Sequence, residues 1–253
     1  KCAEIKKDVL FIGEGWKMYN GEKGTVGMDQ NYMTKTEKVA VFNDEFRDLA
    51  KAGGMSEAGQ GFLTGKKVSI PDLFCNCSGK PVHNYSVTKP SSNVQYFACH
   101  DGLTLHDSIV NNIPLDESTE EGKIEAVNRL KLANALLLTS QGIAFLHAGQ
   151  ERGRTKTAFT TAGTDDCETI GNFVKNSYDS SDNINNFVWN ISDLNKDLLE
   201  YTKNLISLRK NNSAFTISTQ DEVMSRISLL GEYCDDFLMA YKIADIEGDW
   251  YLF

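Results

Sequence analysis

The chain has 253 residues, which is the usual size of one (β/α)₈ barrel and also fits an ordinary domain followed by a smaller one. Its 41% of hydrophobic, 24% of charged and 10% of aromatic residues argue against disorder, coiled coil and collagen. The net charge of −9 argues against a nucleic-acid or anionic-membrane partner and is compatible with a neutral substrate.

Two further counts narrow the class of protein. No apolar run reaches the roughly 18 residues needed to span a bilayer. The 6 cysteines are too sparse for a disulfide scaffold. The C-x-C at Cys75 and Cys77 is interpreted as two loop thiols, since a metal site would need a second pair of ligands nearby.

Short apolar runs predict the strands of a parallel sheet. Each is nearly continuously apolar, which is typical of strands buried on both faces. Each ends in a polar or Gly-rich stretch, and α/β proteins place their sites at such strand ends. The predicted strands are residues 8–13, 39–43, 93–99 and 142–148.

Helical spacing of apolar residues predicts helices over 44–52, 120–140 and 193–210. The segment 53–92 is mostly polar and without clear periodicity, so it is either a functional loop or contains an element that its pattern does not reveal. Beyond residue 212 the pattern changes to a hairpin of strands 237–243 and 249–253. Alternating α and β followed by β-only sequence predicts two domains, 1–212 and 213–253.

Glu14 follows the first predicted strand and lies between Gly13 and Gly15, with Trp16 beside it. The glycines permit backbone conformations that a side chain would forbid. A carboxyl next to an indole at the mouth of an apolar strand loses solvation, which favours its protonated form and suits a general acid. The residues alone leave this interpretation and that of an ordinary loop glutamate equally open.

Polar groups follow the third strand at His100 and Asp101, where a carboxylate could stabilise positive charge and a histidine could bind a hydroxyl. The alternative, favoured by these residues taken alone, is that Asp101 caps the following turn. A later loop carries Tyr178, Asp182 and Asn185, and such amides, carboxylates and aromatics suit sugars. The same oxygen-rich composition suits calcium or a solvated loop.

Taken together, these motifs resemble type I pullulanases, the α-1,6-debranching members of the α-amylase superfamily. LFIGEGW resembles the end of the fifth barrel strand, YFACHDGLTLHD the segment after the seventh strand, and GIAFLHAGQERGRTK the eighth strand. NSYDSSDNINNFVW resembles a stretch that pullulanases carry near the sugar site. The match runs in order over nearly the whole chain. Gly102 replaces a usual Asn, and His106 replaces a usual Trp.

The resemblance implies the second half of a (β/α)₈ TIM barrel, strands five to eight, followed by the start of an all-β sandwich. It implies retaining hydrolysis of α-1,6 branch links in pullulan, glycogen or starch-derived dextrins. Glu14 would be the general acid/base, Asp101 would support the transition-state charge, and His100 would bind a hydroxyl. The substrate-binding set would be Trp16, His100, Tyr178, Asp182 and Asn185.

The nucleophile that the resemblance implies is an Asp after the fourth strand, and no segment of these residues matches it. Both ends of the sequence look cut, so the expected partner is a missing N-terminal half of the barrel, and the fragment alone should be inactive. The reaction needs no cofactor. The alternatives are a non-catalytic α-glucan-binding homologue, or another superfamily enzyme such as isoamylase, branching enzyme or α-amylase.

Overall fold

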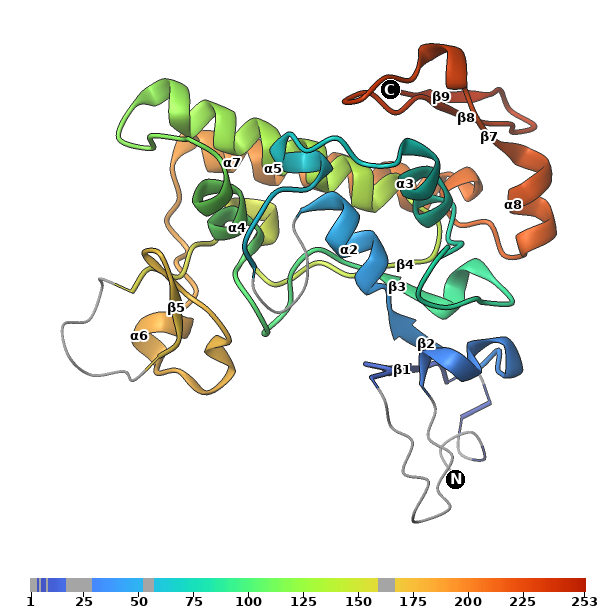
Figure 1. Ribbon diagram of the computed structural model, residues 1–253, viewed down its shortest axis with the longest axis horizontal. Helices are drawn as coiled ribbons and strands as arrows, with labels where there is room; N and C mark the ends of the chain where they lie inside the picture. The colour runs from blue at the N-terminus through green and yellow to red at the C-terminus, as the bar shows by residue number, and fades with distance from the viewer. Residues whose placement is uncertain (1–3, 5, 8, 17–28, 52–56, 159–166) are drawn as a thin grey trace.

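A computed structural model describes residues 4, 6–7, 9–16, 29–51, 57–158 and 167–253 (Figure 1). Its principal sheet has four parallel strands in the order β1-β2-β3-β4. These are β1 (Phe11–Gly13), β2 (Val39–Phe42), β3 (Asn93–Gln95) and β4 (Ile143–Ala144). The four predicted strands are therefore confirmed, although each is shorter than the apolar run. Residue 8, where the first was predicted to begin, lies outside the described residues.

Strand β1 differs from the expectation of burial on both faces. Phe11 is 39% exposed and Ile12 is 52% exposed, whereas Ala40 and Val41 of β2 are fully buried. The difference arises because β1 pairs with β2 along one edge only, and within the described part of the chain no other strand covers it. An apolar run predicts a strand, but the strand's neighbours decide its burial.

The helices cover the sheet and pack on one another. The long pair α5 (Glu120–Thr139) and α7 (Asp193–Asn211) run side by side across the top of Figure 1. The shorter helices are α2 (Asp44–Ala50), α3 (Ile70–Cys77), α4 (Leu105–Asn112), α6 (Asp182–Asn185) and α8 (Gln220–Arg226). The three predicted helices are confirmed as α2, α5 and α7; residue 52, the predicted end of the first, lies outside the described residues.

Helix α3 is the element that the pattern of 53–92 does not reveal, so this segment is not loop throughout. Ser69 caps the helix by accepting a hydrogen bond from the Asp72 N–H, and a proline follows in the first turn. Cys75 and Cys77 therefore lie on a helix rather than in a loop. Burial raises the pKa of the Cys77 thiol to about 12, so Cys77 is an inert core side chain.

A three-stranded antiparallel sheet closes the described chain, formed by β7 (Ile227–Leu229), β8 (Tyr241–Ile243) and β9 (Trp250–Leu252). The predicted hairpin is confirmed by the β8–β9 pairing, while β7 was not predicted. This sheet shares the main hydrophobic core, since the Phe74 and Tyr241 rings lie 5.9 Å apart. The division into domains 1–212 and 213–253 stays a prediction.

Buried amide side chains connect these elements. Asn43, after β2, donates to Asn76 Oδ1 of α3 and to Gln95 Oε1 of β3, both at 3.0 Å. Gln95 donates in turn to the Asn76 carbonyl at 2.7 Å and the Gln141 carbonyl at 3.1 Å. Gln141 reaches the Ala214 carbonyl at 2.8 Å. The chain of amides links the parallel sheet to the segment that precedes the antiparallel sheet.

None of the described helices combines the length and apolarity needed to cross a bilayer.

Replacing Asn43 with alanine should cost about 2–4 kcal/mol of stability. The variant loses the cap of α2, where Asn43 Oδ1 accepts from the Phe46 N–H at 3.1 Å, and leaves two buried acceptors without a donor. Urea unfolding of the purified protein measures the loss. Ser192→Ala is the matched control, because it removes only the exposed cap of α7 and should cost about 1 kcal/mol. Equal losses in the two variants would contradict the role of the amide network.

Candidate active site

The first candidate residues follow β1. Gly15 has a φ of +77°, and a Cβ there would lie 2.8 Å from Val41 Cγ1, so the turn requires glycine. Gly13 makes no such demand, because its added Cβ would meet nothing within 4 Å. Glu14 is exposed and Trp16 is 39% exposed, so the expected loss of solvation at Glu14 is not present. The reason is the exposed position of β1.

His100 and Asp101 lie beyond the end of β3. Their side chains are 59% and 60% exposed, and His100 Nε2 lies 3.3 Å from Asp101 Oδ1. The alternative that Asp101 caps the following helix is wrong, because Thr104 caps α4 and accepts from the Asp107 N–H at 3.1 Å. The His-Asp pair is therefore not engaged in starting the helix and faces solvent.

A reciprocal pair of hydrogen bonds joins this loop to the later motif. Gly102 N donates to Asn176 Oδ1 at 2.7 Å, and Asn176 N donates to the Gly102 carbonyl at 3.1 Å. Asn176 has a positive φ of 54°, a conformation that Asn tolerates better than most residues. The pairing brings Tyr178 beside His100, with their ring centroids 6.1 Å apart and edge to face. The structure thus unites two of the predicted motifs.

Gly102, where the resembling proteins usually carry Asn, has a structural reason to be glycine. Its φ is +70°, and an added Cβ would collide with Glu57 Oε1. Glu57 forms a buried ion pair of 2.6 Å with Lys51, so its carboxylate is fixed in place. The sequence did not identify Lys51 and Glu57, which lie under the His-Asp loop.

The structure separates the roles of the remaining predicted residues. Asp182 begins α6 and is exposed. Asn185 is engaged within the protein: its side-chain nitrogen donates to the Ser177 carbonyl at 2.6 Å and the Ser180 carbonyl at 3.0 Å. Its oxygen accepts from Lys156 Nζ at 3.0 Å. Asn185 therefore shapes the loop that carries Tyr178.

Helix α4 contributes a buried charged group that the sequence did not reveal. Asp107 is fully buried and accepts from the Thr155 hydroxyl and, at 2.9 Å, from Lys156 N. His106 lies 3.2 Å from Asp107 Oδ1 and 2.9 Å from Glu117 Oε1. Burial alone would lower the pKa of His106, but these two carboxylates raise it to about 9. A charged His106 thus occupies the position of the usual Trp.

His147, which follows β4, carries the opposite electrostatic signature. Burial and the neighbouring positive charges of Lys156 and Arg154 lower its pKa to about 4. Its side chain is half-buried. His147 is therefore neutral at physiological pH and, unlike His106, adds no charge to the site.

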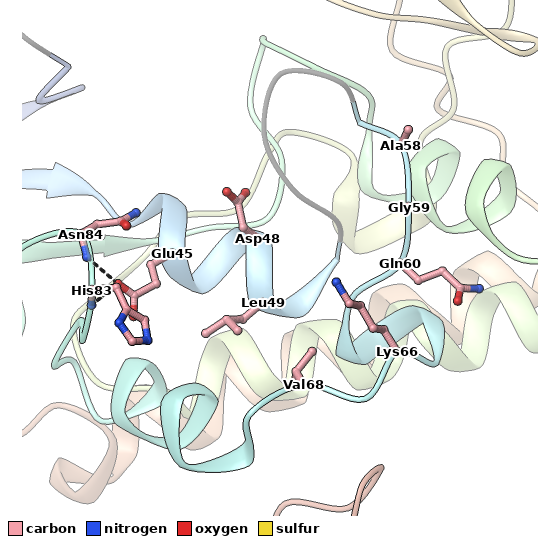
Figure 2. Close-up of a pocket in the computed structure, with 10 residues that line it drawn as sticks. All are labelled: Glu45, Asp48, Leu49, Ala58, Gly59, Gln60, Lys66, Val68, His83 and Asn84. Carbon is pink, nitrogen blue, oxygen red and sulfur yellow. Dashed lines mark hydrogen bonds between the residues drawn. The ribbon is translucent and has the colours of Figure 1, made fainter.

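The cavity that the structure contains beside α2 lies apart from the predicted site residues. A cavity of about 480 Å³ opens beside α2 (Figure 2). Glu45 lines it, and its carboxylate accepts from the Asn84 N–H at 2.9 Å. The cavity contains none of the predicted site residues. Across the described ranges, no three His, Cys, Asp or Glu side chains are grouped so that they could hold a metal ion.

Similar proteins of known sequence and structure can be compared with this chain. No family model matches the chain. Pullulanase A of Streptococcus pneumoniae is 40% identical over 154 residues, which are 60% of this chain and 12% of the relative. The crystal structure of the Group B Streptococcus pullulanase SAP superposes with a TM-score of 0.87 and 34% identity, over 98% of this chain and 36% of that one. The product complex of the multi-modular glycogen-degrading pneumococcal virulence factor SpuA gives 0.87 and 32%, over 97% and 28%.

These matches show that the chain has the same fold as a part of the solved pullulanases. The resemblance to type I pullulanases is confirmed, and the chain is pullulanase-like in both sequence and structure. The chain spans well under half of the length of these relatives, namely 12% of the curated sequence and 28% and 36% of the two solved chains.

A strained backbone costs about 1–3 kcal/mol. Gly102→Ala should destabilise the protein by more than this, because the new methyl group also displaces Glu57. Gly65→Ala is the control, since Gly65 has a φ of +89° with nothing within 4 Å of its added Cβ. Glu57→Ala in the Gly102→Ala background removes the colliding carboxylate. Chemical denaturation of all three variants measures the difference. Equal destabilisation at Gly102 and Gly65 would show that contact with Glu57 is unimportant.

The stability of the protein should fall as pH rises from 6.5 to 8, and His106→Gln should remove most of that fall. The pKa of His106 is raised from 6.5 to about 9, so its stabilisation is complete below 6.5 and is lost as pH rises through 9. Lys156, whose pKa is lowered to about 8, acts above that pH and in the opposite direction. Unfolding midpoints against pH provide the measurement. His83→Gln is the comparison: its exposed imidazole also has a pKa raised by Asp72, but solvent screens that pair, so the variant should remove less of the fall. An unchanged slope in His106→Gln would contradict the assignment.

Proposed function

We propose that this chain is part of a retaining glycoside hydrolase that cleaves α-1,6-glucosidic branch links in pullulan, glycogen or starch-derived dextrins. The observation that carries the proposal is the pairing of Gly102 with Asn176, which sets an exposed histidine and carboxylate beside an exposed tyrosine ring. Polar groups that bind hydroxyls and an aromatic face that packs on a pyranose are what a glucan site needs. The pullulanase resemblance supports the choice of bond.

The architecture supports placing β1 to β4 as strands five to eight of a (β/α)₈ barrel. The four strands are parallel and adjacent in chain order, with α2 and α3 between β2 and β3 and α4 and α5 between β3 and β4, as in a barrel. In this proposal residues 213–253 begin a β-sandwich domain, and the preceding half of the barrel packs against β1. That half would cover Phe11 and Ile12, which are 39% and 52% exposed here.

Each candidate residue has a role in the proposed reaction. Glu14 donates a proton to the leaving oxygen and then acts as base for the incoming water. Asp101 supports the charge of the oxocarbenium-like transition state, and His100 binds a hydroxyl of the same sugar. Trp16, Tyr178 and Asp182 supply exposed surfaces for neighbouring sugars, and Asn185 shapes the loop that carries Tyr178 and Asp182.

The attacking carboxylate is proposed to come from the preceding half of the barrel. Retaining glycosidases hold their two carboxyl groups about 5–5.5 Å apart, so packing of that half would also enclose the exposed Glu14. Enclosure favours the protonated form that a general acid requires. The chemistry uses carboxyl groups alone and needs no cofactor; calcium would have a structural role.

Glu14→Gln should lower kcat on pullulan at least about 10³-fold in a polypeptide that includes the preceding barrel half, because an amide cannot transfer the proton. Residues 1–253 alone should show no turnover. Release of reducing ends from pullulan, with amylose as the α-1,4 comparison, measures the activity. Glu37→Gln, at an exposed residue before β2, is the matched control. Unchanged turnover in Glu14→Gln would refute the assignment, and binding without turnover in the unaltered protein would favour a non-catalytic glucan-binding homologue.

A further inference from the structure

Lys156 is a buried cation at the point where three segments of the site meet. It is 6% exposed, and its backbone is fixed on both sides. Its N–H donates to Asp107 Oδ2 at 2.9 Å, and its carbonyl accepts from the Val174 N–H at 2.8 Å. The lysine is therefore attached to α4 and to β6 (Phe173–Val174) before its side chain makes any contact.

The ammonium group of Lys156 reaches the loop that carries the tyrosine. Lys156 Nζ donates to Ser177 Oγ at 2.5 Å and to Asn185 Oδ1 at 3.0 Å. Ser177 and Tyr178 belong to one 3-10 turn, Ser177–Asp179, and Asn185 ends α6. One cation thus connects the two short helical turns of this loop.

Few other contacts among the described residues orient the Tyr178 side chain. The pairing of Gly102 with Asn176 fixes the backbone just before the turn. Tyr178 itself is 68% exposed and packs on His100 only through an edge-to-face ring contact. The orientation of its ring therefore depends on the turn beneath it, which Lys156 holds together with Asn185, and Lys156 also fixes the Asn185 side chain.

We propose that Lys156 is a positioning residue for the sugar site, which holds the Tyr178 ring beside His100 so that its face is presented to a glucose unit. This inference rests on the proposed function and assigns the lysine no contact with the reacting atoms. Asp107, with His106 and Glu117 behind it, supports the lysine backbone. The arrangement makes substrate affinity depend on a residue that does not contact the sugar.

Lys156→Met tests the inference, because methionine keeps much of the apolar stem and removes the donor. In the polypeptide that includes the preceding barrel half, KM for pullulan should rise about tenfold while kcat changes less than about threefold. Lys203→Met, at an exposed lysine of α7 paired with Glu200, is the matched control and should leave both constants unchanged. A Lys156→Met enzyme with the KM of the unaltered protein would overturn the inference.

A double-mutant cycle with Tyr178→Ala separates positioning from a general loss of stability. If Lys156 acts through the ring, the double variant should have the KM of Tyr178→Ala alone. Independent effects, in which the two increases in KM multiply, would overturn the inference. The cycle gives a result that a merely structural lysine would not.

Ser177→Ala keeps the inference testable if Lys156→Met does not fold. It removes only the hydroxyl acceptor, so it should raise KM about threefold and lower the melting temperature less than Lys156→Met does. The KM of the unaltered protein in this variant would overturn the inference. An unaltered protein that neither binds nor cleaves an α-glucan would overturn the proposed function as well, whereas normal activity with unaffected variants would overturn only the role of Lys156.

Discussion

Hydrogen bonds among buried amide side chains are the constraint on which the parallel sheet depends. The strands have two to four residues each, so their backbone ladders are short. Asn43, Gln95 and Gln141 add cross-links between the strand ends, α3 and the segment after α7. A buried amide without its partner costs about 1–3 kcal/mol, so these groups permit little variation in how the elements meet. The polar core fixes where β3 ends, and the His-Asp loop follows from that point.

The amide network also relates the two sheets. Gln141 lies just before β4, donates to the Ala214 carbonyl and accepts from the Ile217 N–H, both at 2.8 Å. Tyr241 of β8 reaches back to α5, where its hydroxyl lies 3.3 Å from Thr139 Oγ1. The antiparallel sheet is thus joined to the same interior by polar as well as apolar contacts.

Local patterns made most of the secondary structure predictable. The apolar runs of β1 to β4 and the helical periodicity of α5 and α7 are properties of short segments, and they were confirmed. Helix α3 is only eight residues long, so the period was not visible; its signal was Ser69 followed by a proline in the first turn. The exposure of β1 could not be predicted, because it depends on which strands lie beside it.

The motifs of the candidate site were predictable from the sequence, but the hydrogen bonds that join them were not. His100, Asp101 and Tyr178 belong to recognisable stretches, whereas Gly102 and Asn176 are bonded although they are 74 positions apart. The sequence gives only a weak indication that an Asn adopts a left-handed conformation. Lys51 and Lys156 were missed for a related reason, since a lysine is usually a surface residue and its burial depends on distant acceptors.

The parallel register of the principal sheet has a kinetic consequence. Phe11 aligns with Val39, Val41 with Asn93, and Val94 with Ile143, so every ladder joins segments that lie far apart along the chain. Closing such long loops costs entropy before any ladder bond forms. The hydrogen bonds within α5 and α7 are local and carry no such cost, so we expect the parallel ladders to form later than these helices.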